Sequence, residues 1–291
     1  MRSTATSDPP PLGPMLVEVY LCACFPFAGA RMVELAKDER QNPLDIVLRP
    51  LSLRDPWRWL VLGWRDFTRA PLIGLFYGAC FVLMGWALLK VYENAPAYVL
   101  ALSAGFLLMG PFLGMGLYYV SEQLERGAQP EFTASLLAWR RKADTLAIFG
   151  FVLLILELLW GRASLVVFAL SFDGMPDLHG SLLKLLDPKN LNFIVAYVAV
   201  GGVFAAVIYA VSVVSIPMIL DRRADAITAG LTSIRLVVDQ PLVMFCWGAV
   251  ITTLVVVAML PWFAGLLVVG PVLGHASWHA YRSAVAGTRS Q

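Results

Sequence analysis

Hydrophobic runs long enough to cross a bilayer follow one another along most of the chain. A helix needs about 20 apolar residues to cross a hydrocarbon layer roughly 30 Å thick. Six stretches satisfy this length, and none shows the two-residue alternation of a spanning β-strand. They are residues 71–91, 98–120, 145–172, 191–220, 241–260 and 261–281. The pattern predicts an all-α membrane protein with six transmembrane helices.

Glycine and proline recur in the second helix of each successive pair. The second and sixth stretches share a Gly-Pro-x-x-Gly pattern, and the fourth, which is long enough to tilt or kink, has a proline in the comparable place. Small residues allow close helix packing, and prolines bend membrane helices. The expected packing and kink positions are Gly110, Pro111, Gly114, Pro217, Gly270, Pro271 and Gly274.

A short amphipathic, basic segment precedes each odd-numbered span. Apolar residues of 57–67 recur, shifted by 170 positions, in 227–238, and more faintly in 132–139. Such helices lie in the headgroup plane, with tryptophans at the interface and arginines toward anionic lipid. The expected interfacial residues are Trp57, Trp64, Arg65, Trp139, Arg140 and Arg235. This predicts three parallel units, each a cytoplasmic helix plus a hairpin, although glycine and proline are also simply common in membrane helices.

Composition and charge fit this picture. Hydrophobic residues make up 59% of the chain and charged residues 14%, where soluble domains carry about a quarter charged. Counted by expected side, 18 lysines and arginines lie on one side and three on the other. Positive residues favour the cytoplasmic side, so we expect a multi-pass protein of the bacterial inner membrane with both termini in the cytoplasm. Arginines flanking apolar runs do not form a nucleic-acid patch.

The first 50 residues form an N-terminal leader. Its apolar run, 16–30, resembles a signal peptide, but it contains Glu18, and cleavage would export the arginine-rich segment. Met32 is an alternative start, in which case residues 1–31 are either disordered or not translated. The membrane domain is expected over 51–285, and a cytoplasmic tail over 286–291.

Two charged residues fall inside the third span. Glu157 lies near the expected midplane, and Arg162 lies five residues further on, close enough to the surface to extend outward beside Trp160. Buried charges are costly in lipid and are default functional candidates. We expect Glu157 to be protonated or bonded to a neighbouring helix, with a proton or cation site as the alternative.

His275 and His279 are four residues apart on one face of the sixth span. Imidazoles at this spacing can ligate a metal ion or haem, but two ligands make a weak site. The remaining histidine, His179, lies in the external loop. Nearby Ser277, Trp278 and Tyr281 favour a hydrogen-bonding cluster instead. With no nucleophile set and no Cys/His cluster, we expect no enzyme, no metal and no cofactor.

The chain resembles a family of bacterial integral membrane proteins, the domain of unknown function 2189. The resemblance rests on motifs such as Gly63-Trp64-Arg65-Asp66-Phe67, Gly110-Pro111-Phe112 and the stretch from Leu273 to Arg282, and covers roughly residues 54–286. It implies a membrane topology and little chemistry. Members are sometimes labelled cytochrome c oxidase subunit I-like, which the positions of the histidines contradict.

Three functions remain open. The first is a non-enzymatic membrane protein, transporter-like or an accessory scaffold, that contacts anionic lipid. It would form a homo-oligomer or a complex through the Gly110/Gly114 and Gly270/Gly274 faces. The second is a redox or metal-binding subunit of a respiratory oxidase that uses His275 and His279. The third is proton-coupled transport through Glu157.

Overall fold

The computed structural model describes residues 46–95, 98–171, 191–222 and 224–285. They all belong to the second of two compact units, Asn42–Gln291. The signal-like run, the alternative start at Met32, the external loop with His179 and the tail 286–291 lie outside the described residues.

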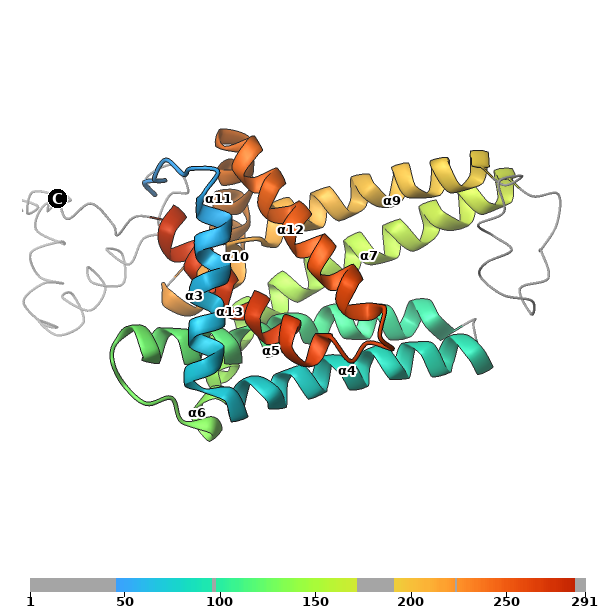
Figure 1. Ribbon diagram of the computed structural model, residues 1–291. Helices are drawn as coiled ribbons and strands as arrows, with labels where there is room; N and C mark the ends of the chain where they lie inside the picture. The colour runs from blue at the N-terminus through green and yellow to red at the C-terminus, as the bar shows by residue number, and fades with distance from the viewer. Residues whose placement is uncertain (1–45, 96–97, 172–190, 223, 286–291) are drawn as a thin grey trace, which may run out of the picture. The chain divides into compact units, whose positions relative to one another are not determined.

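Regular structure in the described ranges is helical (Figure 1). An isolated antiparallel bridge also joins Leu48 to Val285. The helices are α3 (Asp55–Arg69), α4 (Pro71–Asn94), α5 (Val99–Glu125), α6 (Phe132–Leu136), the 3-10 helix η2 (Ala138–Lys142), α7 (Ala143–Ser171), α9 (Leu191–Ser212), α10 (Ser215–Asp221), α11 (Ala226–Asp239), α12 (Pro241–Met259) and α13 (Leu266–Ala284).

Four helical segments are long and apolar enough to cross a membrane, by length and composition. They are Pro71–Asn94, Ala143–Ser171, Leu191–Asp221 and Pro241–Met259. The two other expected spans, α5 and α13, are outside this group. The second half of α13 carries two histidines and an arginine, which lowers its hydropathy.

The sixth helix begins later than the sequence predicts. Residues 261–265 form turns, and α13 starts at Leu266. Trp262 and Phe263 have positive φ values of 53° and 64°, a left-handed conformation that ends a helix. The carbonyl of Trp262 accepts a 2.7 Å hydrogen bond from the indole of Trp86 on α4, which ties this turn to the first hairpin.

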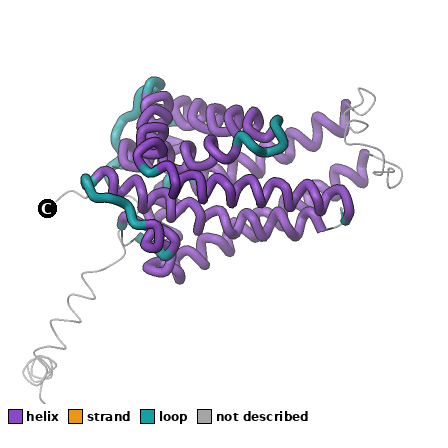
Figure 2. Tube along the Cα trace, turned by 60° about the horizontal axis from the view of Figure 1, so that its bottom comes forward, coloured by secondary structure: helices purple, strands orange, loops and turns teal. Residues whose placement is uncertain are grey.

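Two helix junctions have nearly the same geometry. Ala70 joins α3 to α4 with φ −130° and ψ 57°, and Gln240 joins α11 to α12 with φ −134° and ψ 58°. A proline follows each, at the first position of the next helix, where its missing N–H costs nothing. Because a residue before proline avoids the helical region, α3 and α4 are separate helices running in different directions (Figure 1). Figure 2 draws the described part of the chain as helices joined by loops.

The expected kink in the fourth span is a break in the helix. α9 ends at Ser212 and α10 begins at Ser215, two residues before Pro217. A proline removes a backbone donor and clashes with the carbonyl four residues earlier. Near the break, the hydroxyl of Ser215 lies within hydrogen-bond distance of the carbonyls of Val211 and Ala229 and can donate to either. In contrast, α5 and α13 continue through Pro111 and Pro271.

The two glycine faces predicted for association with other chains have different surroundings, and the prediction for the Gly270/Gly274 face needs correction. A Cβ on Gly270 would lie 2.6 Å from Phe81, and one on Gly274 would lie 2.5 Å from Leu117. That face is therefore occupied by α4 and α5 of the same chain. Around Gly110 a Cβ would meet nothing within 4 Å, and at Gly114 it would meet only Tyr118 of its own helix, at 3.4 Å. The Gly110/Gly114 face has no close helix packing inside the chain.

Closely packed glycines instead lie where α3 and α4 meet α13. A Cβ on Gly63 would lie 2.6 Å from the carbonyl oxygen of Val272, and one on Gly78 would overlap the backbone of Leu267. Helix α13 packs against α3, α4, α5 and α12. The later half of α13 is buried in protein, with Trp278 and Tyr281 fully enclosed. Its surface can therefore be less apolar than that of the four membrane-length segments named above.

Each short helix packs against a long helix other than the one that follows it. α3 packs mainly against α13, α6 and η2 against α5, and α11 against α9 and α10. These long helices also touch one another, since α10 contacts both α5 and α13, and α5 contacts α13. The contacts therefore form a closed ring-like order.

Several apolar side chains of α3 and α11 face outward, although Phe67 on the predicted apolar face of α3 is buried. On α3, Trp57, Val61 and Trp64 are 62%, 67% and 52% exposed, while Trp59 and Gly63 are buried against α13. On α11 the same holds for the whole predicted apolar face, namely Ile227, Leu231, Ile234 and Val238. The buried face of α11 consists largely of small and hydroxyl side chains, including Ala229, Thr232 and Ser233. An outward apolar face is the reverse of the arrangement expected for a surface helix in water.

Candidate functional site

The two histidines of α13 hydrogen-bond to different helices. His275 is fully buried, and its Nδ1 lies 2.8 Å from the hydroxyl of Ser121 on α5. His279 Nε2 lies 2.8 Å from Asp66 Oδ2 on α3. The pair therefore joins α13 to two neighbours rather than converging on one point. Within the described ranges, no group of three or more His, Cys, Asp and Glu side chains is placed to hold a metal ion.

Asp66 is a buried carboxylate held by this cluster. Burial raises the pKa of its carboxyl, but hydrogen bonds from His279 and Ser121 and the charges of His279 and His275 outweigh that effect. The pKa of Asp66 therefore lies below its ordinary value of 3.8. A carboxylate that stays ionised while buried needs such donors, so Asp66, Ser121 and His279 form one structural unit.

A second polar cluster joins the C-terminal ends of α5, α10 and α13. Arg282 Nε lies 3.2 Å from Glu125 Oε2, and Arg282 Nη1 lies 3.6 Å from Asp221 Oδ2. One arginine of α13 thus pairs with acids on two other helices. We call this cluster the Arg282 network; its members are Glu125, Asp221, Arg222, Trp278, Tyr281 and Arg282.

The remaining contacts of the Arg282 network are hydrogen bonds between one charged and one uncharged side chain. Tyr281 donates to Asp221 Oδ2 at 2.5 Å and accepts from Arg222 Nε at 3.0 Å. Trp278 Nε1 donates to Glu125 Oε2 at 3.3 Å. The ion pairs are partly exposed, with 43% of the Arg282 side chain accessible, and such pairs contribute at most about 1 kcal/mol each. The network therefore joins three helices through individually weak contacts.

Glu157 lies between two long helices. Its side chain is buried, and the hydroxyl of Ser103 on α5 donates to Glu157 Oε1 at 3.0 Å. Arg162 is exposed. The two charges therefore lie in different environments, and Glu157 is bonded to a neighbouring helix.

The expected interfacial residues have varied surroundings. Trp57, Trp64, Arg65 and Arg140 are exposed. Trp139 is half-buried and packs edge-on against Phe112, with ring centroids 5.5 Å apart.

Arg235 is also half-buried. Its Nη1 donates to the carbonyl of Ile46 at 3.2 Å, and its Nε lies 3.4 Å from Asp239. This arginine therefore has a partner within the chain, unlike the arrangement expected for a lipid-facing residue.

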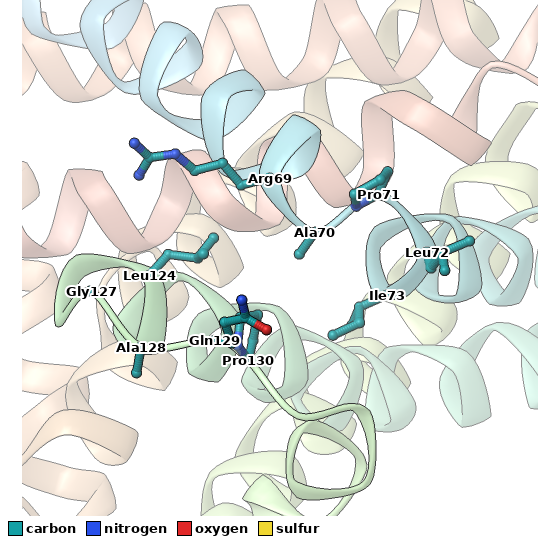
Figure 3. Close-up of a pocket in the computed structure, with 10 residues that line it drawn as sticks. All are labelled: Arg69, Ala70, Pro71, Leu72, Ile73, Leu124, Gly127, Ala128, Gln129 and Pro130. Carbon is teal, nitrogen blue, oxygen red and sulfur yellow. The ribbon is translucent and has the colours of Figure 1, made fainter.

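Two open clefts border these clusters. The larger, about 610 Å³, lies between the α3–α4 junction and the loop after α5 (Figure 3). Its ionisable lining residue is Arg69, whose side chain extends away from the other labelled residues in Figure 3. The smaller, about 370 Å³, is lined by polar and charged groups including Arg49, Arg58, Glu125, His279 and Arg282.

Sequence reasoning did not single out several residues of these clusters. Asp66 lies within a motif that carries the family resemblance, yet no partner was assigned to its charge. Ser121, Glu125 and Asp221 carry no local signal, because a serine or an acidic residue near a helix end is common. Tyr281 was expected in a hydrogen-bonding cluster, but its partners Asp221 and Arg222 were not foreseen.

An all-helical protein with several membrane-length apolar helices and polar contacts at helix ends belongs to the class of integral membrane proteins. Residues 99–221 match the family described as predicted integral membrane protein (DUF2189). The expected family resemblance is thereby confirmed for the segment from α5 to α10. The motifs near Gly63 and from Leu273 to Arg282 lie outside the matched segment. No curated protein and no solved structure matches the chain.

Proposed function

We propose that this integral membrane protein is a non-enzymatic, transporter-like protein of the bacterial inner membrane. In this proposal, α5 and α13 cross the membrane together with the four apolar segments, and both termini are cytoplasmic. The count of positive residues and the six apolar stretches support this topology. The C-terminal ends of α5, α10 and α13, with the Arg282 network, then lie at the cytoplasmic surface.

The proposal includes a repeated unit, which is supported by two features of the structure. The matching junctions at Ala70 and Gln240, and the ring-like order in which each short helix packs against a long helix other than the one that follows it, are what parallel repeats around a common centre require. The outward apolar faces of α3 and α11 support in-plane positions at the interface, with Arg58 and Arg65 toward anionic headgroups.

One observation favours a moving protein over a static scaffold: the Arg282 network. A single arginine pairs with acids from two other helices, through partly exposed ion pairs of low individual strength. Such contacts can break and re-form at little cost, whereas a fixed scaffold is stabilised more simply by apolar packing. We therefore assign the network the role of a cytoplasmic closure.

Spin-label distances test this proposal. On a background without native cysteines, labels at exposed Gln129→Cys and Ile227→Cys report on the ends next to α5 and α10. A transporter-like protein gives two distance populations in nanodiscs, and Arg282→Gln shifts their ratio. Arg65→Gln, a matched loss of one exposed arginine outside the network, leaves the ratio unchanged. A single distribution, identical in all three proteins, would identify a static scaffold.

Proton coupling through Glu157 is a second candidate, favoured by its buried hydrogen bond with Ser103. Proton flux into proteoliposomes under an imposed pH gradient is expected to exceed that of empty vesicles and to be lost in Glu157→Gln. The folded protein should persist, because an amide oxygen still accepts from Ser103. Equal flux in the wild type and the variant would remove Glu157 from the mechanism. The histidine-based redox role has less support, since His275 and His279 are hydrogen-bonded to different helices.

A further inference from the structure

The smaller cleft combines three arginines from different parts of the fold. It has a volume of about 370 Å³ and lies between α3, the ends of α5 and α13, and the segment before α3. Its lining residues are Arg49, Pro50, Leu51, Asp55, Arg58, Leu62, Glu125, His279, Arg282 and Ser283. Arginine suits the recognition of phosphate because its planar guanidinium offers a fixed set of donors.

The two acids of the cleft already have donors. Asp55 Oδ2 accepts a 2.6 Å hydrogen bond from the backbone N–H of Ser52. Glu125 accepts from Trp278 and pairs with Arg282. In contrast, the side chains of Arg49 and Arg58 are exposed and make no hydrogen bond or ion pair with any residue that the structure describes. The cleft therefore has uncompensated positive charge.

Arg49 is held in place by its backbone. Its N–H donates to the carbonyl of Ala284 at 2.8 Å, and its carbonyl accepts from Gln240 Nε2 at 2.7 Å. Two residues on, the N–H of Leu51 donates to Gln240 Oε1 at 2.7 Å. One glutamine side chain thus fixes the backbone on both sides of Pro50. The backbone of Arg49 is therefore held in place, while its side chain stays exposed.

The other two arginines are also positioned by rigid elements. Arg58 is carried by α3, which is fixed on α13 by the buried Trp59, whose indole N–H donates to Ser283 at 3.0 Å. Arg282 is oriented by Glu125 and Asp221. A fixed backbone at Arg49 and Arg58 reduces the conformational entropy that is lost when these side chains bind an anion.

We propose that this cleft binds a phosphate-bearing anion, with Arg49 and Arg58 as the main ligands and Arg282 at the edge of the site. The inference rests on the proposed function, because α3 must lie at the cytoplasmic interface for the phosphate to belong to an anionic lipid. The same chemistry fits a free phosphate anion. Since Arg282 belongs to both the cleft and the Arg282 network, a bound anion competes with Glu125 and Asp221 for it.

Binding of soluble probes to the full-length protein in detergent tests the proposal. The probes are dioctanoyl phosphatidylglycerol, dioctanoyl phosphatidylcholine and inorganic phosphate, followed by calorimetry. The double variant Arg49→Gln/Arg58→Gln is expected to bind phosphatidylglycerol at least about tenfold more weakly than the wild type, since two charge-assisted contacts are lost. The control Arg54→Gln/Arg69→Gln removes the same charge from exposed positions outside the cleft and should change affinity by less than about twofold.

The probes separate the two sources of phosphate. Binding of phosphatidylglycerol without binding of inorganic phosphate identifies a lipid headgroup, and comparable binding of inorganic phosphate identifies a soluble anion. The proposal is overturned if the two double variants lose affinity equally, or if phosphatidylcholine binds as well as phosphatidylglycerol and inorganic phosphate does not bind. Either result leaves the spin-label test of the proposed function untouched, because that test depends on helix movement and not on the anion.

Discussion

Ala70 and Gln240 lie 170 positions apart and have backbone φ and ψ angles within a few degrees of each other. Each accepts a hydrogen bond from the residue four positions later, at 3.1 Å from Gly74 N–H and 3.2 Å from Met244 N–H. In both places a short helix with an outward apolar face passes through one residue into a proline-initiated, membrane-length helix. This correspondence supports the proposed repeat for the outer two units. The middle unit differs, since η2 runs into α7 without a proline.

Six membrane crossings predict a specific labelling pattern. Single cysteines at Asn94 and Trp262 should react with an impermeant maleimide added to whole spheroplasts, while one at Ala128 should react only after the membrane is permeabilised. A green fluorescent protein fused to the C-terminus should fluoresce, as it does in the cytoplasm. If Asn94 and Ala128 label from the same side, α5 does not cross. A labelled Trp262→Cys with a non-fluorescent fusion would remove α13 from the set of spans.

Gly63→Ala is expected to weaken the contact between α3 and α13. The added Cβ would lie 2.6 Å from the Val272 carbonyl oxygen and 2.7 Å from the Ala276 nitrogen, and backbone atoms cannot rotate away. Overpacking of this kind costs about 1–3 kcal/mol, which thermal unfolding in detergent measures. The control is Gly110→Ala, where a Cβ meets nothing within 4 Å. It should leave stability unchanged or raise it by up to about 1 kcal/mol. Equal effects of the two changes would contradict the packing described.

Asp66→Asn is expected to lower the free energy of unfolding by about 1–3 kcal/mol at neutral pH, because the charged hydrogen bond with His279 is lost. The pKa of Asp66 is depressed in the folded protein, so its contribution is present above the unfolded pKa and disappears as pH falls through the folded pKa. The difference between wild type and variant should therefore shrink below about pH 3.8.

The control for this pH dependence is Asp239→Asn, which removes an exposed carboxylate paired with Arg235 at 3.4 Å. A surface pair contributes little, so this variant should unfold near the wild-type temperature at every pH. Unfolding curves recorded from neutral pH to below pH 3.8 test both statements. A gap between Asp66→Asn and wild type that stays constant down to the lowest pH would show that the charge of Asp66 is not responsible.

Trp57 and Trp64 should report an interfacial position of α3. In vesicles of lipids brominated near the headgroup, bromine quenches tryptophans within contact distance. The double change Trp57→Phe/Trp64→Phe should remove part of the quenched emission, because both side chains are more than half exposed, and the exposed Trp262 and Trp86 should account for the part that remains. Trp59→Phe removes a fully buried indole on the same helix and should leave the quenched component unchanged. Quenching in the double variant equal to that of the wild type would place α3 away from lipid.

The locations of the long helices were predictable because hydrophobic length is a local property. α4 and α12 begin at the expected prolines, Pro71 and Pro241, and the fourth span breaks next to Pro217. Helical spacing alone also gives the residues that share one apolar face on α11. The sixth helix was placed too early, because positive φ at Trp262 and Phe263 depends on the turn that joins α12 to α13, and no residue preference signals it.

Partners of the polar residues were beyond prediction. His275 and His279 share one helix face by spacing, which favoured a hydrogen-bonding cluster without naming its partners. They hydrogen-bond to Ser121 and Asp66, which lie 154 and 213 residues away. The similar glycine motifs of α5 and α13 have different surroundings, since Gly274 meets Leu117 while Gly110 meets open space. A glycine motif permits another helix to pack closely. Whether one does depends on which helix lies next to it in the folded protein.

By itself the sequence determined which segments are apolar, where prolines interrupt them, and which faces of the short helices are apolar or basic, because each depends on residues within one or two helical turns. Tertiary structure alone decided that Arg282 pairs with two acids from different helices, that Gln240 positions Arg49, and that α13 lies deep in the protein. Those contacts join residues that are neighbours only after the hairpins pack, and packing depends on the shapes of both surfaces at once.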